Sequence, residues 1–166
     1  MIIVYTGDGK GKTTAALGLA LRCCGGGGKV LILQFIKGSQ NSGELEALKL
    51  LPIEIRQCGL GFTNQGDFST HKAAALETLK IAQDEIISGK WTMIILDEIN
   101  YAVKGGLISE SEMLNLLEIC PPDLHLVFTG RAASEKLIEA ADLVTEMKLI
   151  KHPYQRGIPA QRGIEF

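Results

Sequence analysis

The sequence predicts an α/β fold, a three-layer sandwich in which helices cover both faces of a mostly parallel, six-stranded sheet. Short apolar runs without polar alternation recur along the chain, as expected for strands that are buried on both faces. Longer segments with helical patterns lie between them. A chain that alternates strand and helix forms right-handed crossovers, and these produce an open parallel sheet with helices on both sides.

The strands and helices can be placed from these patterns. The first helix is expected over residues 12–24, before four consecutive glycines, and a second over 69–88, before Gly89, a residue suited to a left-handed helix end. Ser109 and Glu112 form a capping box that opens a third helix, which Pro121 closes. The six expected strands are residues 2–5, 30–35, 53–56, 93–96, 124–128 and 143–147.

Length and composition point to one compact domain over residues 1–166, with 46% hydrophobic and 22% charged residues. The net charge of -2 argues against a nucleic-acid-binding surface. No apolar run approaches the roughly 18 residues of a membrane span, and no signal peptide is evident, so we expect a cytoplasmic protein with no membrane partner. The four cysteines form no CxxC pair and are expected to be buried free thiols.

A Gly- and Lys-rich turn joins the first strand to the first helix. In this arrangement successive backbone N–H groups point into a cup of the size of a phosphate, and glycines let the backbone curl tightly. Lys12 is expected to reach the outer phosphates of ATP, and the Thr13 hydroxyl to bind Mg²⁺. The turn therefore predicts a P-loop NTPase-like domain, with a nucleotide-binding loop made of Gly7, Asp8, Gly9, Lys10, Gly11, Lys12, Thr13 and Thr14.

This loop departs from the usual G-x-x-x-x-G-K-[ST] pattern. Three residues separate Gly7 from Gly11, and Thr6 stands where the first glycine is expected. The loop is therefore tighter than usual, and it carries a second lysine, Lys10. We expect the phosphates to lie differently from those in an ordinary nucleotide hydrolase.

Two carboxylates end the fourth predicted strand, Asp97 and Glu98. Ligands of open α/β sheets bind at the carboxyl ends of the strands, and a hard dication prefers oxygen ligands. Either residue is expected to hold Mg²⁺, directly or through water. The fifth strand leads to Arg131, which has two readings: a phosphate sensor or an ordinary surface arginine.

The sequence offers no evident protein nucleophile or general base. His71 and His125 read as structural, and His152 lies in an irregular C-terminal segment with no preferred reading. No histidine has a serine or cysteine at a spacing typical of a catalytic pair. This suits a reaction whose nucleophile arrives with the second substrate.

Eight segments, in order and over nearly the whole chain, closely resemble the ATP:corrinoid adenosyltransferase family: residues 7–22, 30–38, 61–63, 94–103, 128–131, 142–147, 151–154 and 160–166. The resemblance implies transfer of the 5′-deoxyadenosyl group of ATP to the Co(I) of a reduced corrinoid, cobalamin or a precursor, with release of triphosphate. It also implies a RecA-like sheet, a homodimer, Mg²⁺ or Mn²⁺, and a separate reductant such as a reduced flavoprotein.

The resemblance also assigns roles to single residues. Thr13 and Glu98 match the family's metal-binding positions, and Arg22 matches an arginine that contacts the nucleotide. Phe62 matches an aromatic residue at the corrinoid face, whereas Asn64 stands where the family often has Trp. Lys10 and Lys12 are expected to stabilise the departing triphosphate, with Phe62 shielding the reduced cobalt.

Two other function classes share these features. A nucleoside kinase also joins a phosphate-binding loop to an Asp-Glu strand end, with Glu98 as its candidate base, and it would release ADP. A nucleotide switch that recruits a protein partner would bind ATP without consuming it. The segments beyond the loop favour adenosyl transfer over both.

Overall fold

The computed structural model describes residues 1–38, 43–61 and 67–164. It contains a six-stranded sheet with the order β3-β2-β4-β5-β1-β6, in which every pair of neighbours is parallel. The predicted α/β class is confirmed. The sheet was expected to be mostly parallel, and it is parallel throughout.

All six predicted strands are present, with small differences at their ends. β2 and β4 are continuously buried, and β5 is buried after its first residue, which is why their sequences lack polar alternation. The edge strands differ: the residues of β3 are half-buried or exposed, and each residue of β6 is exposed. The strands are β1 (Ile2–Thr6), β2 (Val30–Gln34), β3 (Ile53–Gln57), β4 (Met93–Asp97), β5 (His125–Thr129) and β6 (Leu143–Glu146).

The three predicted helices are also present. Asp67 caps the second of them by accepting from the Thr70 N–H, and Gly89 adopts the expected left-handed φ of 69° in the turn beyond its end. The Ser109–Glu112 capping box is confirmed. The three are α1 (Lys12–Gly25), α3 (Phe68–Ile86) and α5 (Glu110–Glu118); the sequence did not predict α2 (Gly43–Leu48), α4 (Ile99–Lys104), α6 (Glu135–Ala140) or the 3-10 helix η1 (Pro153–Arg156).

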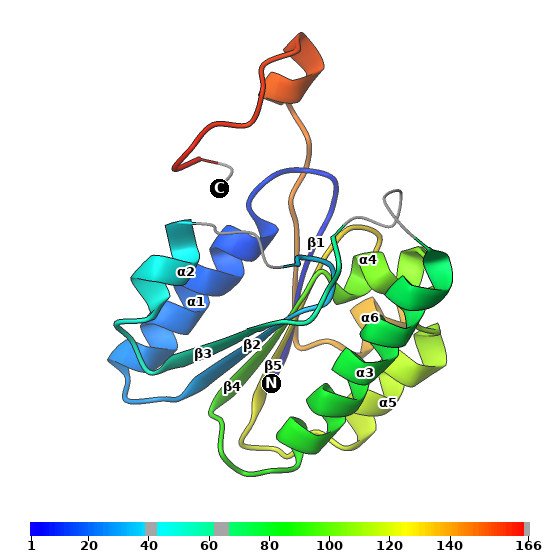
Figure 1. Cartoon of the computed structure of the whole chain (residues 1–166). Helices are drawn as coiled ribbons and strands as arrows, with labels where there is room; N and C mark the ends of the chain where they lie inside the picture. The colour runs from blue at the N-terminus through cyan, green and yellow to red at the C-terminus, as the bar shows by residue number, and fades with distance from the viewer. Residues whose placement is uncertain (39–42, 62–66, 165–166) are drawn as a thin grey trace.

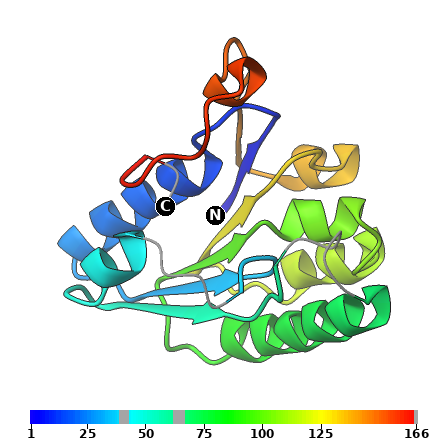
Figure 2. The same cartoon turned by 45° about the horizontal axis from the view of Figure 1, so that its top comes forward.

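The helices form a layer on each face of the sheet. α1 and α2 cover one face, and α3, α4, α5 and α6 cover the other (Figures 1 and 2). Two apolar cores follow from this: Ala16 and Ala20 of α1 pack with Ile32 on the first face, and Leu79 and Leu116 of α3 and α5 pack on the second. Within the described ranges, no helix is long and apolar enough to cross a membrane.

Two of the four consecutive glycines after α1 have a structural reason. Gly27 has a φ of 85°, which favours glycine, and a Cβ on Gly28 would lie 2.5 Å from Cys23 Sγ and 3.2 Å from Thr92 Cβ. A Cβ on Gly25 would meet nothing within 4 Å. The tight return from α1 into β2 therefore explains part of this glycine run.

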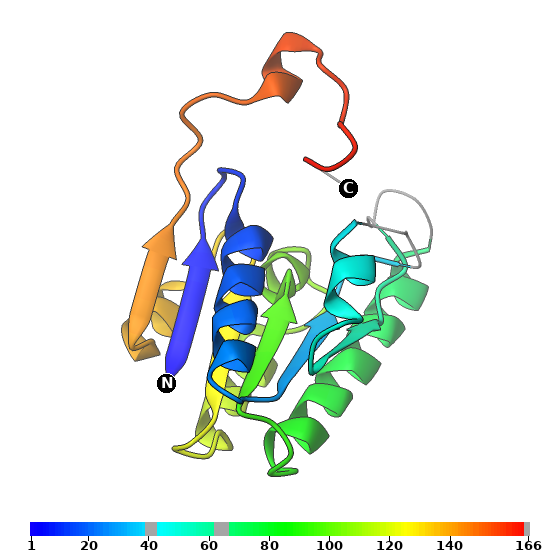
Figure 3. The ribbon, with the colours of Figure 1, turned by 90° about the vertical axis from the view of Figure 1, so that its left-hand side faces the viewer.

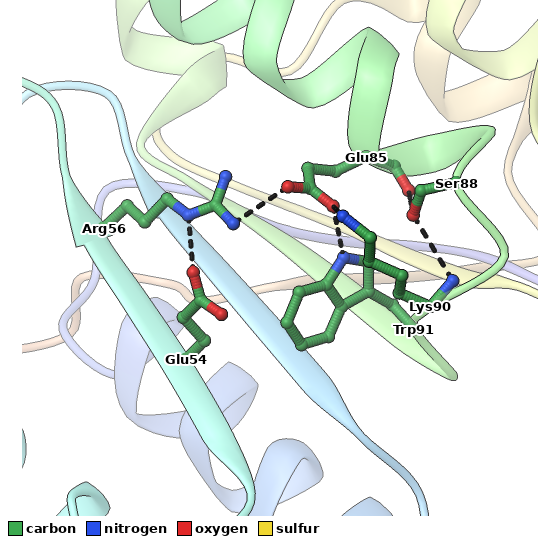
Figure 4. A network of polar contacts seen from close by, with 6 residues as sticks. All are labelled: Glu54, Arg56, Glu85, Ser88, Lys90 and Trp91. Atoms are coloured by element: carbon green, nitrogen blue, oxygen red, sulfur yellow. Dashed lines mark hydrogen bonds and ion pairs between the residues drawn. The ribbon is translucent and has the colours of Figure 1, made fainter.

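A polar network fixes the C-terminal end of α3 against the edge strand β3 (Figure 4). Glu85 of α3 accepts from Arg56 Nη2 at 2.8 Å and from Trp91 Nε1 at 2.7 Å. These bonds hold the pKa of Glu85 below its usual value, the Trp91 bond most of all. Glu54, which lies two residues before Arg56 in β3, accepts from Arg56 Nε at 2.6 Å. The network ties helix, strand and the entry to β4 together.

The segment after β6 returns across the carboxyl end of the sheet. It leaves β6, carries η1 at its far point and comes back toward the side of α1 and α2 (Figures 1 and 3). Near its start, the Met147 carbonyl accepts from the Gly9 N–H at 2.6 Å. Near its end, Gly163 and Ile164 face the same cavity as the loop after β1. The C-terminal segment thus bounds the site from two sides.

Candidate active site

The predicted phosphate-binding loop lies at the carboxyl end of β1 and leads directly into α1. Gly7 and Gly11 have φ angles of 93° and 119°, so the curl of the loop requires residues without a Cβ at both positions. Gly11 is also the N-cap of α1, and none of the described side chains caps the helix there. The first N–H groups of α1 are therefore available to an anion, as the sequence predicts.

Glycine is also needed at positions 7 and 9 because the chain after β6 presses against the loop. A Cβ on Gly7 would lie 2.5 Å from the Met147 oxygen, and a Cβ on Gly9 would lie 2.6 Å from the same oxygen and 2.8 Å from the Lys148 oxygen. The sequence argument explained these glycines only by the tight curl of the loop around a phosphate. The structure adds a second reason, the close packing of two backbones.

Lys12 is almost fully buried, with 7% of its surface exposed. Its ammonium group donates to the Gly7 carbonyl at 2.8 Å and to the Gly9 carbonyl at 2.7 Å. Burial is the main reason that its pKa lies below the usual value. Lys12 thus spans its own loop, and its charge lies against the carbonyl groups of the loop backbone.

Asp97 organises the polar groups beside the loop. Its Oδ1 accepts from the hydroxyls of Thr13 and Thr129, each at 2.8 Å, and its Oδ2 accepts from Gln34 Nε2 at 3.2 Å. Thr129 Oγ1 in turn accepts from the Glu98 N–H at 2.9 Å. Four elements, α1, β2, β4 and β5, therefore meet at one buried carboxylate.

Glu98 follows Asp97 and begins α4 in a left-handed conformation with φ of 62°. A non-glycine residue rarely adopts this conformation, which stores backbone strain where it occurs at functional sites. Burial is the largest cause of the raised pKa of its carboxyl group, and the neighbouring charge of Asp97 is the next. Backbone strain and burial of the ionised carboxyl group therefore both raise the free energy of Glu98, which lies beside Lys12 and Thr13.

The oxygen donors around Asp97 suit a small hard dication. In the described part of the chain no group of three or more His, Cys, Asp or Glu could hold a metal by itself. Mg²⁺ does not need such a group of residues, since it commonly binds one or two carboxylates, a hydroxyl, waters and the phosphates of its nucleotide. Asp97, Glu98 and Thr13 match that donor set. The buried Gln34 Oε1 beside them has no hydrogen-bond partner among the residues that the structure describes.

A cavity of about 450 Å³ opens on the loop. This volume is in the range of small-molecule sites. Lys37 Nζ and Glu44 Oε1, which also line it, form an ion pair of 3.0 Å. The lining residues are Lys10, Gly11, Lys12, Thr13, Thr14, Leu17, Lys37, Gly43, Glu44, Glu98, Gly163 and Ile164.

Other predicted site residues lie away from this cavity. Arg22 is exposed in the last turn of α1, about 15 Å along the helix axis from Lys12. Asp8 and Arg131 line a second cavity, of about 460 Å³, where Arg131 Nε lies 4.0 Å from Asp8 Oδ1. Phe62 and Asn64 fall outside the described residues. The functional roles expected of these residues stay predictions.

The family described as ATP:corrinoid adenosyltransferase BtuR/CobO/CobP matches residues 1–166. The chain belongs to this family. A corrinoid adenosyltransferase of Sinorhizobium sp is 42% identical over 171 residues, covering 100% of this chain and 80% of the relative. The corrinoid adenosyltransferase of Pseudomonas aeruginosa is 38% identical, and that of Escherichia coli K12 is 36% identical. Both matches cover 100% of this chain, together with 83% of the first relative and 85% of the second.

Membership in the ATP:corrinoid adenosyltransferase family confirms the resemblance predicted from the sequence. The family's activity is ATP-dependent adenosyl transfer to a corrinoid, and the comparisons give the kinase alternative no support. The sequence argument nevertheless missed Lys37, Glu44, Gln34 and Thr129. Lys37 and Glu44 belong to no general nucleotide motif, and Gln34 and Thr129 matter because parallel strand ends meet at Asp97.

Proposed function

We propose that this chain transfers the 5′-deoxyadenosyl group of ATP to the Co(I) of a reduced corrinoid and releases inorganic triphosphate. The observation that carries the proposal is the cavity at the phosphate-binding loop, where Lys12, Thr13 and Glu98 converge. Such a site suits a triphosphate with a dication. Membership in the adenosyltransferase family supports this reaction over phosphoryl transfer.

In this reaction the cobalt of the corrinoid is the nucleophile, so the protein has to position the two substrates and stabilise the departing triphosphate. Co(I) donates an electron pair to C5′ of the ribose, the C5′–O5′ bond breaks, and O5′ leaves with the triphosphate. Negative charge grows on that oxygen, and Lys10, Lys12 and the loop N–H groups stabilise it. Lys12 has to exchange its bonds to Gly7 and Gly9 for bonds to phosphate.

We propose that Thr13, Asp97 and Glu98 hold Mg²⁺ or Mn²⁺. When bound, the dication neutralises charge on the triphosphate and improves it as a leaving group. Asp97 contributes by aligning the Thr13 hydroxyl, since the two atoms lie 2.8 Å apart. Glu98 contributes a carboxylate. A bound cation would favour the ionised form of this group over the protonated form.

Further parts of the proposal rest on the family resemblance. These are a homodimer, a reduced flavoprotein as electron donor, nucleotide contact by Arg22 and a corrinoid contact by Phe62. Two others have support in the chain itself. Residues 1–166 form one domain, since both cores share one sheet. Cytoplasmic residence is supported by the four cysteines, which are free thiols, a state typical of a reducing compartment. They were expected to be buried, and all four are half-buried.

The test is an anaerobic assay with ATP, Mg²⁺ and chemically reduced cobalamin. Adenosylcobalamin and triphosphate should form in equal amounts, and Lys12→Ala and Thr13→Ala should each remove most of the turnover while the protein remains folded. ADP as the product would instead indicate a kinase. Consumption of no ATP would indicate a binding module.

The corrinoid contact is tested separately with Phe62→Ala. If Phe62 lies at the corrinoid face, this variant should lose corrinoid affinity while its affinity for ATP stays near normal, because the phosphate-binding loop is a separate element. Asn64→Trp should tighten corrinoid binding, since it restores the family aromatic and adds apolar surface. Equal losses of both affinities in Phe62→Ala would contradict this placement.

A further inference from the structure

The ion pair of Lys37 and Glu44 lies in the nucleotide cavity but outside every element that binds phosphate or metal. Lys37 follows the carboxyl end of β2, and Glu44 lies in the first turn of α2. Their side chains are 35% and 25% exposed, so the pair is half-buried and still reaches the cavity. A half-buried pair that lines a binding cavity differs from the exposed pairs common on protein surfaces.

The elements that line the cavity differ in chemistry. Lys10, Lys12, Thr13 and the loop backbone provide cations and N–H donors, which suit phosphate. From α2, Glu44 provides a carboxylate, which only accepts hydrogen bonds when it is ionised. A triphosphate cannot bind next to an uncompensated carboxylate, whereas the hydroxyl groups of a ribose donate to one.

Lys37 makes a carboxylate acceptable at this place. Its ammonium group lies 3.0 Å from Glu44 Oε1, so the pair is neutral and does not repel the triphosphate. Lys37, Glu44 and Glu98 line the same cavity, so the ion pair and the proposed metal-binding residues face one space.

We propose that Glu44, held by Lys37, accepts hydrogen bonds from the ribose hydroxyls of ATP. Acidic residues recognise ribose hydroxyls in this way in dinucleotide-binding folds. The inference rests on the proposed adenosyl transfer and deepens it, since fixing the ribose aims C5′ for in-line displacement. Glu44 contacts the substrate in this role, and Lys37 is a positioning residue.

The test compares ATP with 2′-deoxy-ATP and 3′-deoxy-ATP, by equilibrium titration and by kcat/KM for adenosyl transfer. The wild type should prefer ATP over at least one analogue by about 10-fold to 100-fold, as expected for loss of a hydrogen bond to a charged group. Glu44→Ala should reduce the use of ATP to near that of the analogue and leave the analogue little affected. Lys37→Met should also reduce the preference for ATP over the deoxy analogue, because the Glu44 carboxylate loses its fixed position.

Two controls separate this role from a general loss of structure. Glu46→Ala removes a carboxylate of the same helix that pairs with Lys49 at 2.6 Å and lies outside the cavity, so it should leave the preference for ATP unchanged. Inorganic triphosphate has no ribose. Its inhibition constant should therefore be no higher for Glu44→Ala than for the wild type, and it should fall where the unpaired charge of Lys37 attracts the triphosphate.

Equal losses of ATP and of both analogues in Glu44→Ala, or weaker inhibition by triphosphate, would overturn the ribose contact. Failure of the proposed function would look different. The wild type would then form no adenosylcobalamin, while the titrations would still report whether Glu44 distinguishes ATP from its deoxy analogues.

Discussion

Gly9 donates its backbone N–H to the Met147 carbonyl at 2.6 Å, so the phosphate-binding loop rests on the chain that follows β6. A Cβ on Gly9 would lie 2.6 Å from the Met147 oxygen. We expect Gly9→Ala to lower the free energy of unfolding by about 1–3 kcal/mol, as overpacking of closely packed atoms does. It should also weaken ATP binding, since the loop has to shift. Thermal unfolding and ATP titration measure the two effects.

Gly18→Ala is the matched control. Gly18 lies in the interior of α1, and a Cβ there would meet nothing within 4 Å. This change should raise stability by about 0.5–1 kcal/mol, because alanine loses less backbone entropy in a helix than glycine. A Gly9→Ala protein as stable as Gly18→Ala would show that the contact with Met147 does not constrain the loop.

Glu98 is expected to reduce the stability of the protein in the absence of metal and nucleotide. Its pKa is raised above the usual value of 4.5, chiefly by burial, so the folded state binds its proton more tightly than the unfolded state does. The destabilisation is absent below pH 4.5 and develops as the pH rises through the raised pKa. Glu98→Gln should therefore raise the Tm at pH 7, by about 2–4 °C for each kcal/mol recovered.

The same substitution should abolish most of the dependence of activity on Mg²⁺. Glu77→Gln, an exposed change within α3, should alter neither the Tm nor the metal titration. A lower Tm in Glu98→Gln at pH 7 would mean that the carboxylate stabilises the fold. In that case the cost ascribed to its burial would be wrong.

Much of the fold could be predicted because the strong signals are local. Buried parallel strands carry continuous apolar runs, and the capping box at Ser109 sets the start of α5 from four residues of sequence. The helices α2, α4 and α6 each span six residues, which is less than two turns, so no apolar periodicity develops in them.

The site was predictable where one segment makes it and not where several meet. Lys12 and Thr13 belong to a single strand-to-helix turn, and the sequence shows it directly. Thr129 hydrogen-bonds Asp97 from a neighbouring strand, 32 residues away in sequence. Glu44 reaches the cavity from a helix that the sequence did not predict. Such contacts depend on strand order, which local patterns do not determine.

Glu85 is expected to make stability depend on acid pH. Its pKa lies below the usual value of 4.5. The hydrogen bond from Trp91 is the main cause, and the bond from Arg56 also lowers it, while partial burial opposes both. Its contribution is therefore present above pH 4.5 and is lost as the pH falls through the lowered pKa. Glu85→Gln should reduce the free energy of unfolding by about 1–3 kcal/mol at pH 7. Denaturant titrations should show this difference shrinking toward pH 3, and a difference independent of pH would contradict the electrostatic explanation.

Thr129 links the two carboxylates of the site, and its hydroxyl is expected to position both. Thr129 Oγ1 donates to Asp97 Oδ1 at 2.8 Å and accepts from the Glu98 N–H at 2.9 Å. Thr129→Val keeps the shape and removes both bonds, which leaves a buried acceptor and the N–H of a left-handed residue without this partner. Stability should fall by about 1–3 kcal/mol, and the Mg²⁺ concentration for half-maximal activity should rise, because Asp97 and Glu98 lose their alignment.

Thr129→Ser distinguishes the hydroxyl from the methyl group. The serine retains donor and acceptor, so the Mg²⁺ titration should stay close to that of the wild type even if the lost methyl lowers stability in the fully buried position. The Mg²⁺ concentration for half-maximal activity should therefore be similar in the wild type and Thr129→Ser and clearly higher in Thr129→Val. A Val variant with a wild-type titration would show that the backbone of β4 alone positions the carboxylates. A Ser variant as impaired as Val would assign the effect to packing, and the hydroxyl link between Asp97 and Glu98 would have no role in binding the metal.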